Sequence, residues 1–306
     1  MTMIQEFIMF IIGLTLLIKG SDEFVEAGSR VAKGFGVSEF LIALVLASIA
    51  TTLPEVTVSA IAAYEGNSGI ALGNAVGSAL ANIALILGVS AMIMPLKVDE
   101  IAWRNSLFML AVTFYAWFLM RDMTISRFEG FSLIMIYLIF LYYLYKKHIA
   151  LEEVGRSNGK NVKRDVVILF LSGIVVVVGA RMVVTSAVTI ARTLEIPEVV
   201  IGLTLVSIGT SLPELANSLT ATLKKIPNIS VGNIVGANIL DILMVIGIAS
   251  IIRPITVDES IFSFTMPLTL LVMGILTLSL RLTNKVSRGT SAVLLMIYAY
   301  FLYSQL

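Results

Sequence analysis

The sequence contains no cysteine and only one histidine, His148, so disulfide bonds and thiolate metal sites are excluded. Charged residues are scarce as well, at 13% of the chain, against about 25% in an ordinary soluble domain. No small-residue cleavage site follows the first apolar stretch, and we therefore expect no removable signal peptide. Without a histidine or cysteine inside the apolar stretches, an intramembrane hydrolytic enzyme lacks its usual catalytic groups.

Apolar residues are what the chain has in abundance. They make up 58% of the 306 residues, and the mean hydropathy is +0.98. An apolar stretch of about 20 residues can cross the hydrocarbon core of a bilayer as a helix. We therefore expect an all-α membrane protein with ten transmembrane helices. The ten candidate spans are residues 4–32, 38–64, 70–94, 104–121, 128–146, 166–191, 197–222, 229–252, 260–281 and 289–305.

The basic residues predict an orientation. If the loops alternate between two sides, fifteen Lys and Arg residues fall on one side and four on the other. The richer side includes Lys97, Lys224, Lys285 and the polar segment 146–165. Cytoplasmic loops carry an excess of Lys and Arg, so we expect a multi-pass protein of the cell membrane with both termini extracellular and the 146–165 linker cytoplasmic.

The chain matches itself without a gap when it is shifted by 159 residues. "IATTLPEVTVSA" at 49–60 lies over "IGTSLPELANSL" at 208–219, and "GNAVGSALANI" at 73–83 lies over "GNIVGANILDI" at 232–242. Five spans in each repeat is an odd number, so the two halves must have opposite orientations in the membrane, which is typical of transporters. The predicted division is a first repeat at 1–145, a cytoplasmic linker at 146–165 and a second repeat at 166–306.

Polar residues interrupt the second and seventh spans on one helix face, because they recur at intervals of three and four residues. Pro54 and Pro213 lack an N–H group and deprive a carbonyl four residues earlier of its helical partner, so we expect a broken helix in each repeat. Hydroxyls, carboxylates and freed carbonyls are the hard oxygen ligands that Ca²⁺ takes. The first repeat supplies Ser48, Thr51, Thr52 and Glu55, and the second Ser207, Thr210, Ser211 and Glu214.

The third and eighth spans carry a second polar stripe. Asn74, Ser78 and Asn82 lie four residues apart in the first repeat. The matching places in the second repeat are occupied by Asn233, Ala237 and Asp241. Glycines with small-xxx-small spacing precede both stripes and predict a close approach to the broken helices. An unpaired acid inside a membrane is costly, which makes Glu55, Glu214 and Asp241 functional candidates. Buried, protonated carboxyl groups that join helices are the structural alternative.

These doubled motifs, "TTLPE…GNAVGSALAN" and "GTSLPE…GNIVGANILD", resemble the paired alpha repeats of the cation/calcium exchanger superfamily, in particular its sodium/calcium exchangers. The resemblance covers the whole chain and implies an antiporter in which Glu55 and Glu214 share one Ca²⁺, helped by the carbonyls of Thr51 and Thr210. It also implies flanking Na⁺ sites and a midplane cluster completed by Asn82 and Asp241. One Na⁺ set would be Ser48 carbonyl, Thr51, Glu55 and Ser78, and the other Ser207 carbonyl, Thr210 and Glu214.

Two residues depart from that family, Thr52 and Ala237, and the second bears on the coupling ion. Ala237 replaces the family's serine, so one Na⁺ site loses an oxygen ligand. Gly77 and Gly236 stand where proton/calcium exchangers of the superfamily carry an acid, which argues against proton coupling. Thr52 replaces a serine and keeps the hydroxyl.

The resulting hypothesis is a Na⁺/Ca²⁺ antiporter that is not an enzyme and has no cofactor. Its partners would be the transported Ca²⁺ and Na⁺ and the lipid bilayer, with no nucleic acid, and we expect a monomer. Coupling of Ca²⁺ to H⁺, or additional transport of K⁺, is the alternative. A channel is disfavoured because no ring-forming filter motif is present.

Overall fold

The computed structural model describes residues 3–34, 47–149, 162–225 and 227–305, almost all of them helical. In the first half of the chain the elements are α1 (Met3–Gly34), α3 (Ala47–Glu65), α4 (Ser68–Ala81), α5 (Gly88–Ile93), β1 (Leu96–Lys97), α6 (Ile101–Leu119), β2 (Thr124–Ile125) and α7 (Arg127–Ile149). In the second half they are α8 (Val162–Thr193), α9 (Glu198–Ile201), α10 (Ser207–Thr210), α11 (Leu212–Leu223), α12 (Pro227–Leu240), α13 (Ile246–Ile252), β3 (Ile255–Thr256), α14 (Met266–Thr283), β4 (Lys285–Val286) and α15 (Arg288–Ser304).

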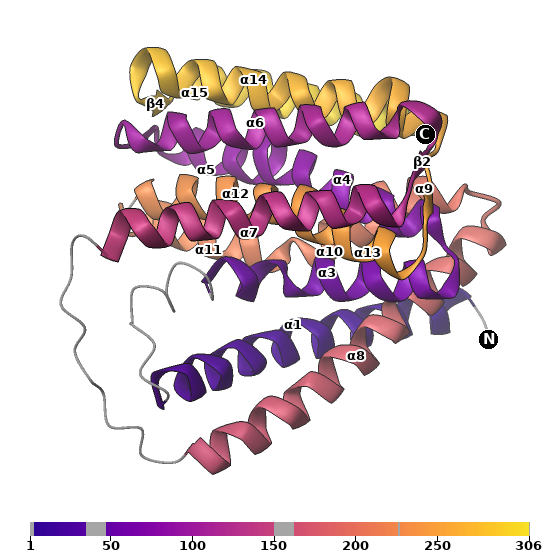
Figure 1. The fold of residues 1–306 in the computed structure, drawn as a ribbon. Coiled ribbons are helices and arrows are strands. Elements are labelled where there is room, and N and C mark those ends of the chain that lie inside the picture. Colours follow the sequence, from indigo (N-terminus) through magenta and orange to yellow (C-terminus); the bar gives the residue numbers. More distant parts are fainter. Residues whose placement is uncertain (1–2, 35–46, 150–161, 226, 306) are drawn as a thin grey trace.

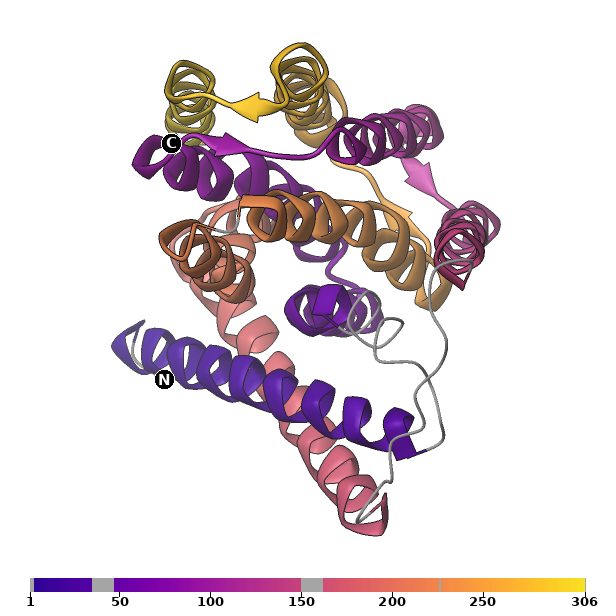
Figure 2. The same cartoon turned by 90° about the vertical axis from the view of Figure 1, so that its left-hand side faces the viewer.

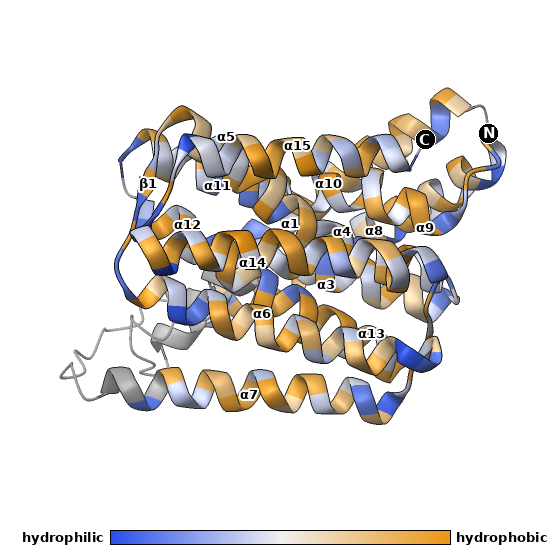
Figure 3. Cartoon of the chain, turned by 90° about the horizontal axis from the view of Figure 1, so that it is seen from above, coloured by the Kyte–Doolittle hydropathy of each residue, from blue (hydrophilic) through white to orange (hydrophobic). Residues whose placement is uncertain are grey.

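The apolar helices confirm an all-α membrane protein. Six helices of the described residues are long and apolar enough to cross a membrane, or seven if the bent pair Glu198–Thr210 and Leu212–Leu223 forms one span. Hydrophilic residues gather at the two ends of the bundle, and apolar residues occupy the middle of the helices (Figure 3). The first residues of the expected span 38–64 lie outside the described residues. Most of the expected linker 146–165 also lies outside them.

The arrangement has a central layer between two outer groups. Helices α6, α7, α14 and α15 lie along one side, and α1 and α8 lie together on the opposite side (Figures 1 and 2). Between them, the windows Ser68–Ile93 and Pro227–Ile252 are each 78% buried, whereas the other candidate spans are 22–44% buried. The two helices with the predicted polar stripe therefore form the core of the molecule.

Two small strand pairs mark the ends of the bundle. β1 pairs with β4, with Leu96 opposite Val286, and β2 pairs with β3, with Thr124 opposite Thr256. We call these the β1–β4 end and the β2–β3 end; they lie at opposite ends of the helices (Figures 1 and 3). The C-terminal end of α1 lies at the β1–β4 end (Figure 1), where Arg30 bonds to Asp165.

Helices α1 and α8 run antiparallel in close contact. A Cβ atom added to Gly179 would lie 2.6 Å from the backbone nitrogen of Leu17 and 2.8 Å from the carbonyl of Gly13. Such a separation is too short for any side chain, so the backbones can meet only because glycine is present. At the β1–β4 end, Nε of Arg30 donates a hydrogen bond of 2.7 Å to Asp165. The two helices are thus joined along much of their length.

The proline-containing segments behave differently from the prediction. The second repeat is broken, since α10 and α11 meet at Ser211 with a bend of 46°. In the first repeat α3 continues through Pro54 as one helix from Ala47 to Glu65, so the expected break at Pro54 is wrong. Pro213 lies in the first turn of α11, where a missing N–H group costs nothing because the first turn has no helical acceptor for it.

Candidate functional site

The predicted site residues come together in the core. Of the eleven, Ser48 lies in the first turn of α3, and its side chain is outside the described residues. The remaining ten are each at most 6% exposed: Thr51, Thr52, Glu55, Ser78, Asn82, Ser207, Thr210, Ser211, Glu214 and Asp241.

Glu55 is bound by the opposite half of the chain. Its Oε1 accepts a hydrogen bond of 3.1 Å from the hydroxyl of Ser211, which lies at the break between α10 and α11. Its Oε2 has no hydrogen-bond partner among the described residues. The bend in the second repeat therefore holds the acid of the first.

Further bonds between the halves surround this pair. The hydroxyl of Ser78 donates to the carbonyl of Ser207 at 3.4 Å, and the hydroxyl of Thr210 donates to Oδ1 of Asn74 at 3.0 Å. Asn74 in turn donates to Ser59 at 3.0 Å. The expected Na⁺ sets place Ser78 in one set and the carbonyl of Ser207 in the other, and the hydrogen bond from Ser78 joins the two groups.

Close helix packing makes these bonds possible. A Cβ atom on Gly77 would lie 2.6 Å from the carbonyl of Leu203 and 2.8 Å from the hydroxyl of Ser207. The predicted close approach is therefore confirmed for α4. In the second repeat, a Cβ atom on Gly232 would meet no described atom within 4 Å.

Asp241 is bonded to Asn82, which also bonds to Asn238. Nδ2 of Asn82 donates to Oδ2 of Asp241 at 3.3 Å and to Oδ1 of Asn238 at 2.9 Å. Nδ2 of Asn238 donates to the carbonyl of Ala79 at 2.9 Å. The sequence reasoning overlooked Asn238, because it lies beside the predicted stripe and only the approach of α4 to α12 brings it in.

The helices widen where these residues lie. A π-helical turn covers Asn82–Leu87, and another covers Asp241–Val245. Such turns are rare and often occur at functional sites. The first turn begins at Asn82 and the second at Asp241, which are the matching residues of the two polar stripes. No local feature of the sequence predicts these π-helical turns.

Glu214 contrasts with Glu55. It is fully buried, and neither of its carboxylate oxygens has a hydrogen-bond partner in the part of the chain that the structure describes. Thr51 lies near Glu214, and the charges of Glu55 and Asp241 act on it. All three mid-membrane acids therefore share one region of low dielectric.

Oxygen atoms without partners concentrate at this region. Ten buried side-chain nitrogen and oxygen atoms of the described residues have no hydrogen-bond partner, and seven of them are oxygens of predicted site residues. Buried polar groups in proteins are normally hydrogen-bonded, so this concentration needs a specific reason. The seven oxygens belong to Thr51, Thr52, Glu55, Asn82, Glu214 (both carboxylate oxygens) and Asp241.

A hard cation fits this donor set, since Ca²⁺ takes six to eight oxygen ligands from carboxylates, amides, carbonyls and water. No group of three or more acidic, histidine or cysteine side chains is close enough to bind a metal within the described ranges. A bound ion would therefore need neutral oxygens in addition to the carboxylates.

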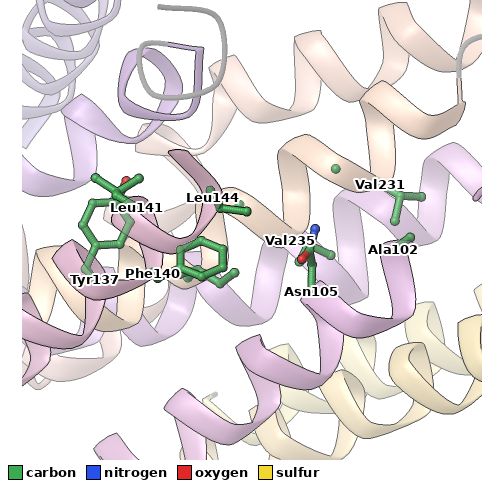
Figure 4. Close-up of a pocket in the computed structure, with 11 residues that line it drawn as sticks. Ala102, Asn105, Tyr137, Phe140, Leu141, Leu144, Val231 and Val235 are labelled. Carbon is green, nitrogen blue, oxygen red and sulfur yellow. The ribbon is translucent and has the colours of Figure 1, made fainter. Parts of the chain in front are cut away.

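A cavity of about 110 Å³ lies between α6, α7 and α12 (Figure 4). Asn105 and Tyr137 are its polar lining residues, and aliphatic and aromatic side chains such as Phe140 and Val235 complete it. None of the three mid-membrane acids lines it, so it is not the ion site.

Comparison with known proteins agrees with the chemistry of the site. The family model described as sodium/calcium exchanger protein matches residues 6–146 and 165–306. The sodium/calcium exchanger MaX1 of Methanosarcina acetivorans is 32% identical over 97% of both chains, and an uncharacterized membrane protein of Methanocaldococcus jannaschii is 36% identical over 94% of both. A structure of the sodium-calcium exchanger NCX_Mj, soaked with 10 mM Na⁺ and zero Ca²⁺, is 34% identical, covers 99% of both chains and has a TM-score of 0.70.

Proposed function

The chain belongs to the sodium/calcium exchanger family, and we propose that it exchanges Ca²⁺ for Na⁺ across the membrane by alternating access to one carboxylate site. The observation that carries this proposal is the set of seven buried oxygens without partners on Thr51, Thr52, Glu55, Asn82, Glu214 and Asp241.

Exchange follows from competition for the carboxylates. Three acids in one buried region repel one another, and cations relieve that repulsion. One Ca²⁺ or several Na⁺ can neutralise the site, whereas both together would leave excess positive charge. An ion-free site is costly in a low dielectric, so the protein changes sides with ions bound, and the result is antiport without leak.

We propose ten transmembrane helices in two inverted repeats, residues 1–145 and 166–306. In support, Asn82 bonds to Asp241 and Ala79 to Asn238, and both pairs are 159 residues apart. Residues that contact their own repeat counterparts indicate a pseudo-two-fold axis between the halves. The counterpart helices α1 and α8 are also antiparallel, as inversion requires.

The orientation is proposed from the charges. Lys97 and Lys285, which the count of basic residues assigns to the cytoplasm, lie in the two strands of the β1–β4 end. Arg127 and Arg253, assigned outside, lie beside β2 and β3 at the other end. We propose that the β1–β4 end is cytoplasmic and both termini are extracellular.

Alternating access would come from α1 and α8, which lie outside the buried core and pack closely on each other. Leu14 of α1 contacts Gly209, the residue next to Thr210. Movement of the pair along the core would uncover the site on one side as it covers the other.

The test is ⁴⁵Ca uptake into proteoliposomes that contain the purified protein. An outward Na⁺ gradient, with Na⁺ inside, should drive Ca²⁺ accumulation, and a pH gradient or a K⁺ gradient of equal size should not. Uptake that follows the pH gradient and ignores Na⁺ would replace Na⁺ by H⁺ as the coupling ion. A requirement for K⁺ together with Na⁺ would make K⁺ a third substrate.

A further inference from the structure

A cavity of about 320 Å³ lies between α1, α3 and α11. Its lining includes Thr51 and Pro213, which is one residue from Glu214, and also Asp22 and Thr220. Asp22 lies between the middle of α1 and Arg30 at the β1–β4 end, and Thr220 lies in the last turn of α11. The start of α12, which follows α11, is bonded through Asn228 to Asp99 beside β1. The cavity therefore runs from the carboxylate site toward the β1–β4 end.

A buried polar atom indicates that the cavity serves a ligand. Thr51 is 6% exposed, lines the cavity, and has a hydroxyl oxygen without a hydrogen-bond partner among the described residues. An unsatisfied buried hydroxyl is costly. A cation that enters along this wall would be coordinated by that oxygen on its way to Glu214.

Among the described residues that line this cavity, Asp22 is the only acid. No hydrogen bond or ion pair joins it to another described side chain, whereas the next acid toward the helix end, Glu26, is paired with Arg30 at 3.3 Å. The nearest base along α1 is Lys19, one helical turn before Asp22, and it forms no ion pair with Asp22 among the described residues. Arg30, further along the helix, is bonded to Glu26 and Asp165. The carboxylate of Asp22 therefore lies at the cavity without an ion pair to a described base.

The repeat supplies a contrast. The shift of 159 residues that relates the halves places Arg181 of α8 at the position of Asp22. Nε of Arg181 lies 3.7 Å from Oε1 of Glu65 at the end of α3. At the corresponding place toward the β2–β3 end, the chain thus has a base paired with an acid instead of a free carboxylate.

We propose that this cavity is the path by which cations reach the site from the β1–β4 end, and that Asp22 raises the local cation concentration in it. Arg181 provides no such attraction at the opposite end. The two faces of the exchanger would therefore differ in apparent ion affinity for an electrostatic reason outside the site itself. This inference rests on the proposed exchange function.

The expected effect has a definite dependence on ion charge. A local potential multiplies the concentration of an ion by a Boltzmann factor whose exponent is proportional to the charge, so the factor for Ca²⁺ is the square of the factor for Na⁺. If Asp22→Asn raises the apparent KM for Na⁺ about twofold, it should raise that for Ca²⁺ about fourfold, and both effects should shrink at high ionic strength. The maximal rate should not change, since Asp22 is not a ligand of the site.

The experiment measures KM for Ca²⁺ and Na⁺ separately at each membrane face, in right-side-out and inside-out vesicles. Asp22→Asn should raise both KM values at the face of the β1–β4 end alone, and Asp22→Glu should restore them. Glu23→Gln is the matched control: it removes one charge from the adjacent exposed residue, which does not line the cavity.

Three outcomes would overturn the inference while the wild-type protein exchanges Na⁺ for Ca²⁺ normally: unchanged KM in Asp22→Asn, an equal shift at both faces, or an equal shift from Glu23→Gln. A loss of maximal rate without a change in KM would show a structural role and would also overturn it. If the wild-type vesicles show no Na⁺-dependent Ca²⁺ flux, the proposed function itself fails.

Discussion

Replacement of Glu214 by glutamine tests the site most directly, because the two central acids differ in their surroundings. Glu55 accepts a bond from Ser211, but both oxygens of Glu214 lack partners and the charges of Glu55 and Asp241 act on it. In ion-free buffer Glu214→Gln removes repulsion and breaks no described hydrogen bond of the side chain. We therefore expect the melting temperature without ions to be equal to that of the wild type or higher.

With Ca²⁺ the expectation reverses. A ligand at 100 times its Kd stabilises the folded state by about 2.7 kcal/mol. Removing one partner of a buried charge pair costs about 3–5 kcal/mol, which corresponds to a Kd increase of about a hundredfold or more. At the same Ca²⁺ concentration the variant would then gain at most about 0.4 kcal/mol. Nearly all of the stabilisation by Ca²⁺ should disappear.

The assay is thermal unfolding in detergent with and without Ca²⁺, combined with ⁴⁵Ca uptake. Glu65→Gln is the control, since Glu65 lies at the end of α3 and is paired with Arg181; it should keep both the Ca²⁺ shift and transport. A Glu214→Gln protein that is still stabilised by Ca²⁺ and still transports it would refute a shared carboxylate site.

Three further changes test other parts of the proposal. A cysteine at Ser157, in this cysteine-free chain, should react with an impermeant thiol reagent only from the cytoplasm; labelling from outside would reverse the orientation. Ala237→Ser adds the oxygen that the second repeat lacks, so it should raise the apparent Na⁺ affinity from the extracellular side about tenfold, which corresponds to about 1.4 kcal/mol. The Ca²⁺ affinity measured without Na⁺ should stay nearly constant. A flux assay in which the Ca²⁺ affinity changes and the Na⁺ affinity does not would show that the Na⁺ site is misassigned. Gly179→Ala should strongly reduce transport, because its Cβ atom would lie 2.6 Å from the backbone of Leu17. Gly274→Ala is the control and should leave transport unchanged, because its Cβ atom would meet no described atom within 4 Å. Equal ⁴⁵Ca uptake by the two variants would mean that transport does not depend on the contact of α1 with α8.

The sequence predicted the positions of the core helices and much of the site. Polar residues three or four apart necessarily share a helix face, and Gly77 indicated where another backbone could approach. In the structure that approach brings Ser78 to Ser207. Both signals are predictable because the residues that form one helix face are close together in the sequence, and a helix is a local structure.

Features that depend on the opposite half of the chain were not predictable in this way. The bond from Ser211 to Glu55 and the inclusion of Asn238 require knowledge of which helices meet and at what height. The proline rule failed at Pro54 for a related reason: tertiary packing decides whether a helix bends at a missing hydrogen bond, and α3 does not break. The same residue type at Pro213 begins a new helix.

The buried polar atoms without hydrogen-bond partners form a pattern when each residue is compared with its counterpart in the other repeat. Thr210 bonds to Asn74 and Ser211 bonds to Glu55. The counterparts of these four residues, in the same order, are Thr51, Asn233, Thr52 and Glu214.

Each of those four counterparts carries a buried atom without a partner. The polar contacts are therefore made at one set of repeat positions and are absent at the counterpart positions, one of which, Thr51, lines the cavity that also contains Asp22. Alternating access between inverted repeats requires such an asymmetry, because the two states exchange the roles of the halves. In the opposite state of the proposed exchange, the hydroxyl of Thr52 would bond to Glu214, and the carboxylate of Glu55 would lose its bond from Ser211. The same acids could then receive ions from either face without any change in the ligands.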